Sequence, residues 1–130
     1  MNAKKRHFGL SLSELMVVLA ILAIISAIAV PWYSGHTVTA RRAAAKAEMM
    51  TIANLQEQFL AANRRYATQA NLTASGYQLP AEVSDYYSYA VAVTTTSYTL
   101  TFTPLSTGPQ SADGSLTLNN FGAKTPEDKW

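Results

Sequence analysis

Glu14 is the residue of the N-terminal region whose chemistry most needs an explanation. It stands at the edge of a run, residues 15–30, that contains only Leu, Ile, Val, Ala and Met apart from Ser26. An unpaired charge inside a membrane costs about 2.5–3.5 kcal/mol even on insertion scales. Residues 4–7, Lys-Lys-Arg-His, form a basic cluster before the run. The sequence therefore predicts that Glu14 has a partner that compensates its charge.

The rest of the sequence offers few groups for catalysis or metal binding. The chain has no cysteine and two histidines, His7 in the basic cluster and His36 just after the apolar run. A single surface histidine is not by itself a catalytic site. The residue inventory therefore predicts no enzyme, no cofactor and no metal site.

The apolar stretch is long enough to cross a membrane. A helix over residues 10–33 would be about 36 Å long, whereas a hydrocarbon core is about 30 Å thick. Trp32 and Tyr33 would lie at the far interface, and the basic cluster would keep the N-terminus in the cytoplasm. Ala27-Ile28-Ala29 also fits a signal-peptidase site, so a cleaved signal peptide and an uncleaved anchor are both consistent with the composition.

A third interpretation starts from the order of residues around Gly9. Gly9 is followed by the apolar Leu10, and Glu14 is the fifth residue after the glycine. With the basic leader, the long apolar run and Pro31, this order resembles the prepilin signature of type IV pilins. The resemblance implies that a prepilin peptidase cuts after Gly9 and methylates the new N-terminus at Leu10. It also implies that Glu14 takes part in filament assembly and that Pro31 bends the helix.

The segment departs from the usual pilin pattern at two positions. Leu10 stands where phenylalanine is usual, and Ser13 is an uncommon residue just before Glu14. Neither change removes the glycine or the glutamate, so the implied processing and assembly roles are unaffected.

Processing would change the charge of the protein. The formal charge of +2 comes from ten Lys and Arg against eight Asp and Glu, and three of the ten lie at residues 4–6. A chain that begins at Leu10 is therefore slightly acidic, at about −1. The basic residues at the start are a topology signal and do not indicate a nucleic-acid partner.

Apolar residues at spacings of three and four predict an amphipathic helix over residues 34–66. This helix continues from the 10–33 segment, and it should bend or loosen at Pro31 and Gly35. We expect its apolar stripe to pack on a sheet. The stripe comprises Ala45, Met49, Ile52, Leu55, Phe59, Ala62 and Tyr66.

Large apolar residues that alternate with small or polar residues predict strands at 87–93, 98–103 and 116–119. Residues 67–85 should form a connecting loop with one short helical turn, and residues 120–130 an irregular tail. The predicted fold is α+β, a long N-terminal helix packed on a small antiparallel sheet of three to four strands. The chain then divides into a leader at 1–9, an apolar helix at 10–33, an amphipathic helix at 34–66 and the rest of the globular domain at 67–130.

The C-terminal half adds to the resemblance. Residues 98–101 and 116–119, followed by Gly122 and a terminal Trp130, are similar to the final strands of minor pilins of type IVa pili. In that subgroup two cysteines close the tail, and the corresponding positions here hold Asp113 and Lys129. Their opposite charges suggest an ion pair, although an Asp113-Gly114 turn and a local pairing of Lys129 are equally simple interpretations. Phe121 and Trp130 should pack against the sheet.

The resemblance implies a type IV pilus structural subunit or minor pilin, serving adhesion, motility or DNA uptake. It would span the inner membrane once, with lipid around its helix and the globular domain in the periplasm, and then join an extracellular filament. Its partners would be other pilin subunits, the prepilin peptidase and the inner-membrane assembly platform.

Three other functions stay open from the sequence. A pseudopilin of a type II secretion system shares the N-terminal signature, and a secreted soluble domain would follow a cleaved signal peptide. A DNA-binding pilin for competence is the third. It would have to use the helix-borne cations Arg41, Arg42, Lys46, Arg64 and Arg65. Arginines on a helix usually form a solvated face, so nucleic acid is not favoured as a partner.

Overall fold

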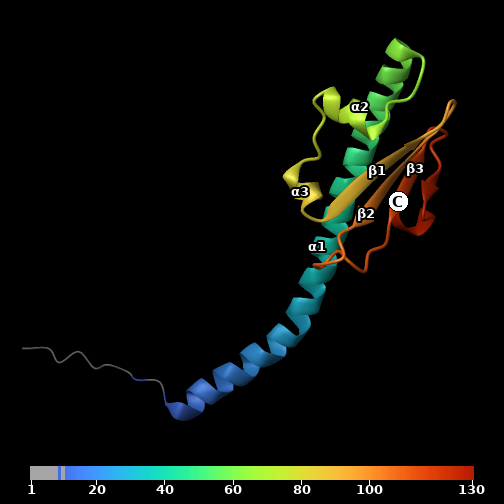
Figure 1. Cartoon of the computed structure of the whole chain (residues 1–130). Helices are drawn as coiled ribbons and strands as arrows, with labels where there is room; N and C mark the ends of the chain where they lie inside the picture. Colours follow the sequence, from blue (N-terminus) through green and yellow to red (C-terminus); the bar gives the residue numbers. More distant parts are fainter. Residues whose placement is uncertain (1–8, 10) are drawn as a thin grey trace, which may run out of the picture. The chain divides into compact units, whose positions relative to one another are not determined.

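A computed structural model describes Gly9 and residues 11–130, which form two compact units. The first ends at Gly35 and the second runs from His36 to Trp130. One long helix, α1 (Leu12–Asn63), belongs to both units, as its blue-to-green ribbon shows (Figure 1). Each unit is described by itself below.

The first unit consists of the apolar half of α1. Every described side chain from Ser11 to Gly35 is exposed. An 18-residue window of this helix has a mean hydropathy of 2.7 and none of it is buried, so it is long and apolar enough to cross a membrane. Pro31 lies inside α1 without ending it, and the Ser34 hydroxyl donates to the Pro31 carbonyl at 2.9 Å. The predicted bend at Pro31 stays a prediction.

The second half of α1 is amphipathic and begins the core of the second unit. Ala45, Met49 and Ile52 are fully buried, and Leu55 and Phe59 are partly buried against the same cluster. These outcomes confirm most of the predicted stripe, because residues three and four apart share one helix face. The prediction fails at its end: α1 stops at Asn63, Ala62 is exposed, and the buried Tyr66 lies beyond the helix.

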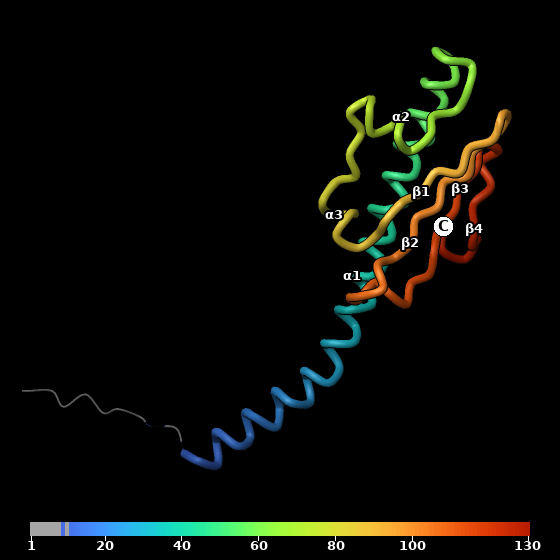
Figure 2. Tube along the Cα trace, in the orientation of Figure 1, coloured from blue at the N-terminus to red at the C-terminus, as the bar shows by residue number. Residues whose placement is uncertain are grey.

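Four antiparallel strands follow in the order β1-β2-β3-β4 (Figure 2). Their bounds are β1 (Tyr87–Val93), β2 (Tyr98–Pro104), β3 (Leu116–Asn119) and β4 (Lys124–Thr125). The predicted three strands are confirmed within one residue. A sheet of three to four strands was predicted, and the fourth strand lies where the sequence predicted an irregular tail, residues 120–130: Lys124 pairs with Leu118 and Thr125 with Thr117.

The connection between α1 and the sheet holds two short helices, α2 (Gln69–Ala74) and α3 (Ala81–Ser84). The sequence predicted one short turn there. Thr68 caps α2 through a capping box: its hydroxyl accepts from the Asn71 amide at 3.2 Å, and the Asn71 side chain accepts from the Thr68 amide at 3.2 Å. This reciprocal bonding satisfies two amides that a helix start otherwise leaves without partners.

The core is built from one face of the sheet and one face of α1. Phe102 on β2 is fully buried, directly opposite Tyr89 on β1 and Leu116 on β3. The ring centroids of Tyr89 and Phe102 lie 5.9 Å apart, and those of Tyr87 and Phe102 6.5 Å apart. Such aromatic pairs add about 0.5–1.5 kcal/mol beyond the burial of their area. The second unit therefore has its own hydrophobic core without any disulfide.

Candidate assembly site and buried polar cluster

The first candidate site is Glu14 at the start of α1. The Ser11 amide donates to Glu14 Oε2 at 2.7 Å, and the Glu14 amide donates to Ser11 Oγ at 3.2 Å. Ser11 and Glu14 thus form a capping box, in which each side chain satisfies a main-chain amide of the other residue. The carboxylate also lies where the helix dipole favours a negative charge. The S-x-x-E spacing that signals this cap was present in the sequence but was not used.

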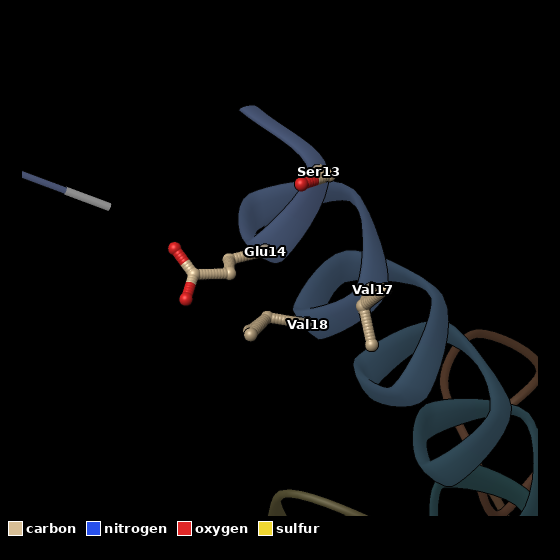
Figure 3. Close-up of a pocket in the computed structure, with 4 residues that line it drawn as sticks. All are labelled: Ser13, Glu14, Val17 and Val18. Atoms are coloured by element: carbon tan, nitrogen blue, oxygen red, sulfur yellow. The ribbon is translucent and has the colours of Figure 1, made fainter. Parts of the chain in front are cut away.

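The carboxylate of Glu14 is presented outward. Figure 3 shows it extending away from the helix, with the side chain of Val18 one turn further along on the same side. Ser13, Glu14, Val17 and Val18 line a shallow, open depression. A carboxylate has about four lone-pair sites, so the bond from Ser11 leaves capacity for further donors. The site can therefore accept an additional donor or cation among apolar side chains.

The predicted processing site falls partly outside the described residues. Gly9 is described and exposed, whereas Leu10 and the basic cluster at residues 4–7 lie outside the described residues. Cleavage between Gly9 and Leu10 therefore stays a prediction.

The second candidate site is a buried polar cluster around Asp113. Arg42 on α1 donates through Nε to Asp113 Oδ2 at 2.9 Å and forms an ion pair with Oδ1 through Nη2. The Tyr87 hydroxyl donates to Oδ2 at 2.6 Å, and Gln110 Nε2 donates to the same oxygen at 3.0 Å. Gln110 Nε2 also lies 3.1 Å from the Val38 carbonyl. One carboxylate thus links the helix, the sheet and the loop before β3.

The cluster shifts the pKa of its members. Burial tends to raise the pKa of Asp113, but hydrogen bonds from Arg42, Tyr87 and Gln110 outweigh burial and lower it to about 2. The hydrogen bond to Asp113 raises the pKa of Arg42, and burial together with the bond to Asp113 raises that of Tyr87. At neutral pH the aspartate is charged and the tyrosine is a neutral donor, which is the arrangement a buried carboxylate needs.

The predicted ion pair between Asp113 and Lys129 is corrected by these contacts. The two residues are neighbours, but Lys129 Nζ donates to the main-chain carbonyl of Asp113, while the carboxylate is paired with Arg42. Lys46 on α1 then donates to the Lys129 carbonyl at 2.9 Å. The sequence could not identify Arg42 because the contact joins residues 71 positions apart.

The expected packing of the tail is half correct. Trp130 is partly buried against the core, and Lys124 Nζ lies 4.9 Å from the centre of its ring. Phe121, in contrast, is 83% exposed at the turn between β3 and β4. The tail therefore rests on Trp130 and the polar cluster rather than on Phe121.

Gln56 was not among the residues of the predicted apolar stripe, yet it is fully buried. Its Nε2 donates to the Ala67 carbonyl and its Oε1 accepts from the Ala67 amide, both at 2.7 Å. The side chain thus satisfies both main-chain groups of a buried residue after the helix. The spacing 45, 49, 52, 56 already placed Gln56 on the buried face, but its polarity concealed it.

The fold and the capped glutamate define a class of protein: a long N-terminal helix, apolar in its first half, followed by a small antiparallel sheet, as in type IV pilins. A model of the prokaryotic N-terminal methylation motif matches residues 4–30. The model of the family described as "Type IV minor pilin ComP, DNA uptake sequence receptor" matches residues 31–117. The chain belongs to this minor-pilin family.

The structural comparison agrees with the family. A high-resolution structure of a type IV pilin from Shewanella oneidensis is 26% identical to the chain, with a TM-score of 0.53. The likeness covers 69% of this chain and 92% of that one. No curated protein sequence matches. The predicted pilin family, the α+β fold and the role of pilus subunit are therefore confirmed, and the family match selects a minor pilin over the pseudopilin and the soluble secreted domain.

Proposed function

We propose that this minor pilin joins its filament through Glu14 after cleavage between Gly9 and Leu10. The observation that carries the proposal is an outward-facing carboxylate at the start of an exposed, apolar helix. Cleavage exposes the amine of Leu10, and Glu14 of one subunit pairs with the amine of a neighbour. Removing one partner of such a buried pair typically costs about 3–5 kcal/mol, so the contact sets the register between subunits.

The steps before assembly follow from the same segment. Cations at residues 4–6 hold the leader in the cytoplasm, the helix crosses the inner membrane, and the second unit is in the periplasm. On assembly, neighbouring pilin helices replace lipid around the exposed apolar side chains.

The mass of the exported protein tests the processing step. A chain that begins at Leu10 with a methylated amine is expected. A chain that begins at Val30 indicates signal peptidase acting after Ala29, and the proposal then fails.

Two matched variants test the assembly step. Glu14→Ala removes the carboxylate, whereas Ser11→Ala removes only the hydroxyl half of the cap and keeps the carboxylate. We expect both variants to be processed normally, and only Glu14→Ala to be depleted from sheared filaments. Equal depletion of the two variants would assign the effect to helix capping and would reject the pairing.

A second candidate function is binding of extracellular DNA. The description of the matching family, a DNA uptake sequence receptor, favours this function, and the match at residues 31–117 covers most of the second unit. The sequence did not favour nucleic acid as a partner, because arginines on a helix usually form a solvated face and the processed chain has a charge of about −1. The test is titration of the processed full chain, in an uncharged detergent, into labelled duplex DNA. Saturable binding that weakens steeply with salt supports the function. No binding at low salt rejects it.

A further inference from the structure

The two edges of the sheet are protected to different degrees. The strand order places β4 on one edge and β1 on the other (Figure 2). β4 is two residues long, begins with Lys124 and is followed by Pro126. A short strand, a lysine and a proline are devices by which proteins prevent pairing at a sheet edge. β1 has seven residues, Tyr-Ser-Tyr-Ala-Val-Ala-Val, without a charge or a proline. The edge at β1 therefore lacks the protection of the edge at β4.

The main-chain groups of β1 point alternately toward β2 and away from it. The Leu105 amide donates to the Tyr86 carbonyl at 2.9 Å, and the Thr94 amide donates to the Ser97 carbonyl at 2.8 Å. Hydrogen-bonded pairs alternate along an antiparallel ladder, and the register of β1 with β2 is continuous. The even-numbered residues of β1 therefore bond to β2, and the odd-numbered residues present their amides and carbonyls to the open edge.

Few of these outward groups have a partner. The Gln69 side chain on α2 donates to the Tyr89 carbonyl at 3.2 Å, which agrees with the outward direction of the odd-numbered residues. Across Gly9 and residues 11–130, the structure shows no hydrogen bond to the outward amides and carbonyls of Val91 and Val93. This half of β1 is therefore an open row of donors and acceptors with which an added strand can pair.

The residues of β1 fit a second copy of the same strand. Ala90 is the middle residue of β1. If two β1 strands pair antiparallel about Ala90, the odd-numbered residues of the two strands face one another, and their outward groups bond. Each tyrosine of one strand then lies opposite a valine of the other, and aromatic residues opposite β-branched ones stabilise a sheet. The pairs are Tyr87 with Val93 and Tyr89 with Val91.

The side chains on both faces of such a pair are compatible with it. On the solvent face they are small and exposed, and they are Ser88, Ala90 and Ala92. On the opposite face, Tyr89, Val91 and Val93 are only partly buried against the core. Pairing would cover apolar area that these three side chains leave exposed, which favours association.

We propose that β1 pairs with β1 of a second copy of this chain, across a two-fold axis at Ala90, and so joins two four-stranded sheets into one. A contact of this kind uses the same surface on both subunits and closes on itself, whereas a filament is built from open, head-to-tail contacts. The pairing is therefore separate from the proposed filament contact of Glu14. Its affinity comes from main-chain hydrogen bonds, and its specificity comes from the alternate side chains.

Disulfide trapping tests the pairing directly, because the chain has no cysteine of its own. Ala90 would face its counterpart in a non-hydrogen-bonded pair with Cα atoms about 4.5 Å apart, and disulfides span about 4.4–6.8 Å. We expect Ala90→Cys, in the processed full chain in an uncharged detergent, to form a covalent dimer on mild oxidation. Thr103→Cys is the control: it is exposed on the same face of the sheet, but on β2, and should stay monomeric.

Opposite charges test the same register without a covalent bond. Ala90→Lys places a lysine opposite its own counterpart, and like charges directly opposite weaken a strand pair. Sedimentation should show self-association weakened by about fivefold for Ala90→Lys and for Ala90→Glu, and restored in an equal mixture of the two. Both variants should unfold at the same urea concentration as the wild type, since Ala90 is exposed. Glu14→Ala should leave the association unchanged, which distinguishes it from filament assembly.

Other results overturn the pairing. Equal crosslinking of Thr103→Cys would show that the detergent micelle brings the chains together. Lysine and glutamate variants that associate like the wild type, alone and mixed, would assign the association to another surface. A monomeric wild type, with no dimer of Ala90→Cys, would show that the edge stays unpaired. Crosslinking of Ala90→Cys in cells to a different protein, without a homodimer, would assign the edge to that protein.

Discussion

Both halves of α1 carry large apolar side chains, but these side chains are exposed in the first half and buried in the second. In the first half, Ile24 is 64% exposed and Ile28 71% exposed, and this half has the mean hydropathy expected of a membrane span. In the second half, Ile52 and Met49 are fully buried by the sheet of the same chain. One helix therefore carries two apolar surfaces. The first stays exposed unless other molecules cover it, and the second is buried by the sheet of its own domain.

The two carboxylates discussed above follow the same division. Asp113 in the second unit receives donors from Arg42, Tyr87 and Gln110, so its charge is compensated within the domain. Glu14 in the first unit has a capping bond from Ser11 and faces outward. Because burying a carboxylate without donors is costly, Asp113 is satisfied within its own core, whereas the exposed Glu14 suits the contact with a neighbouring subunit proposed above.

The largest expected effect compares the same truncation in both halves of α1. Ile52→Ala should lower the free energy of unfolding of the second unit by about 4 kcal/mol, because Ile52 is fully buried and leaves a cavity. Ile24→Ala should leave it unchanged within about 0.5 kcal/mol. Urea unfolding of the full chain in an uncharged detergent measures both. A substantial loss for Ile24→Ala would show that the first half is part of the folded core after all.

The next effect concerns the polar cluster. Asp113→Ala should cost about 3 kcal/mol, at the lower end for a buried pair, since the Arg42 side chain is 21% exposed. A double-mutant cycle of Asp113→Ala with Arg42→Ala should give a coupling energy of about 1–3 kcal/mol. The cycle with Lys129→Ala should give about zero, because alanine retains the carbonyl that Lys129 contacts. Strong coupling to Lys129 would restore the pairing expected from the sequence.

Acid should weaken the same cluster by a smaller amount. The pKa of Asp113 is about 2 in the folded chain and about 3.9 in an unfolded one, so folding depresses it. The stabilisation is present above pH ~4 and is lost as the pH falls through ~2, a change of about 2 kcal/mol. The difference between the wild type and Asp113→Asn, measured by urea unfolding from neutral pH to about pH 2, isolates this contribution. If that difference stays constant with pH, folding does not shift the pKa of the aspartate.

Much of the fold could be predicted because local patterns determine it. The stripe at 45, 49 and 52 and the alternation in 87–93 and 98–103 follow directly from helix and strand periodicity. The two residues of β4 are too few to show alternation, and they pair only because the turn at Gly122 reverses the chain. The pairing of Arg42 with Asp113 depends on the tertiary fold, which no local pattern encodes.

The site was predictable to a similar extent. Gly9, Leu10 and Glu14 were identified from their spacing, and the match to the N-terminal methylation motif supports that part of the pattern. The sequence could not show which arginines pair within the domain and which are exposed, because Arg42 and Arg64 look alike in the sequence. Only the positions of Asp113 and of the end of α1 distinguish them.

The smallest expected effect belongs to Phe121, an aromatic residue of the second unit that is exposed. Phe121→Ser should change the free energy of unfolding by no more than about 0.5 kcal/mol, because the side chain is 83% exposed. The turn itself does not need the ring: Asn119 Oδ1 accepts from the Phe121 amide at 3.0 Å and from the Ala123 amide at 2.9 Å, and both bonds survive the substitution. Trp130→Ala is the matched aromatic truncation and should cost about 1–2 kcal/mol, since Trp130 is partly buried against the core. Thermal unfolding of both variants shows which of the two aromatic residues stabilises the domain. If Phe121→Ser destabilises the domain as much as Trp130→Ala, then Phe121 packs in the folded domain as the sequence predicted, and the second unit buries its aromatic side chains without exception.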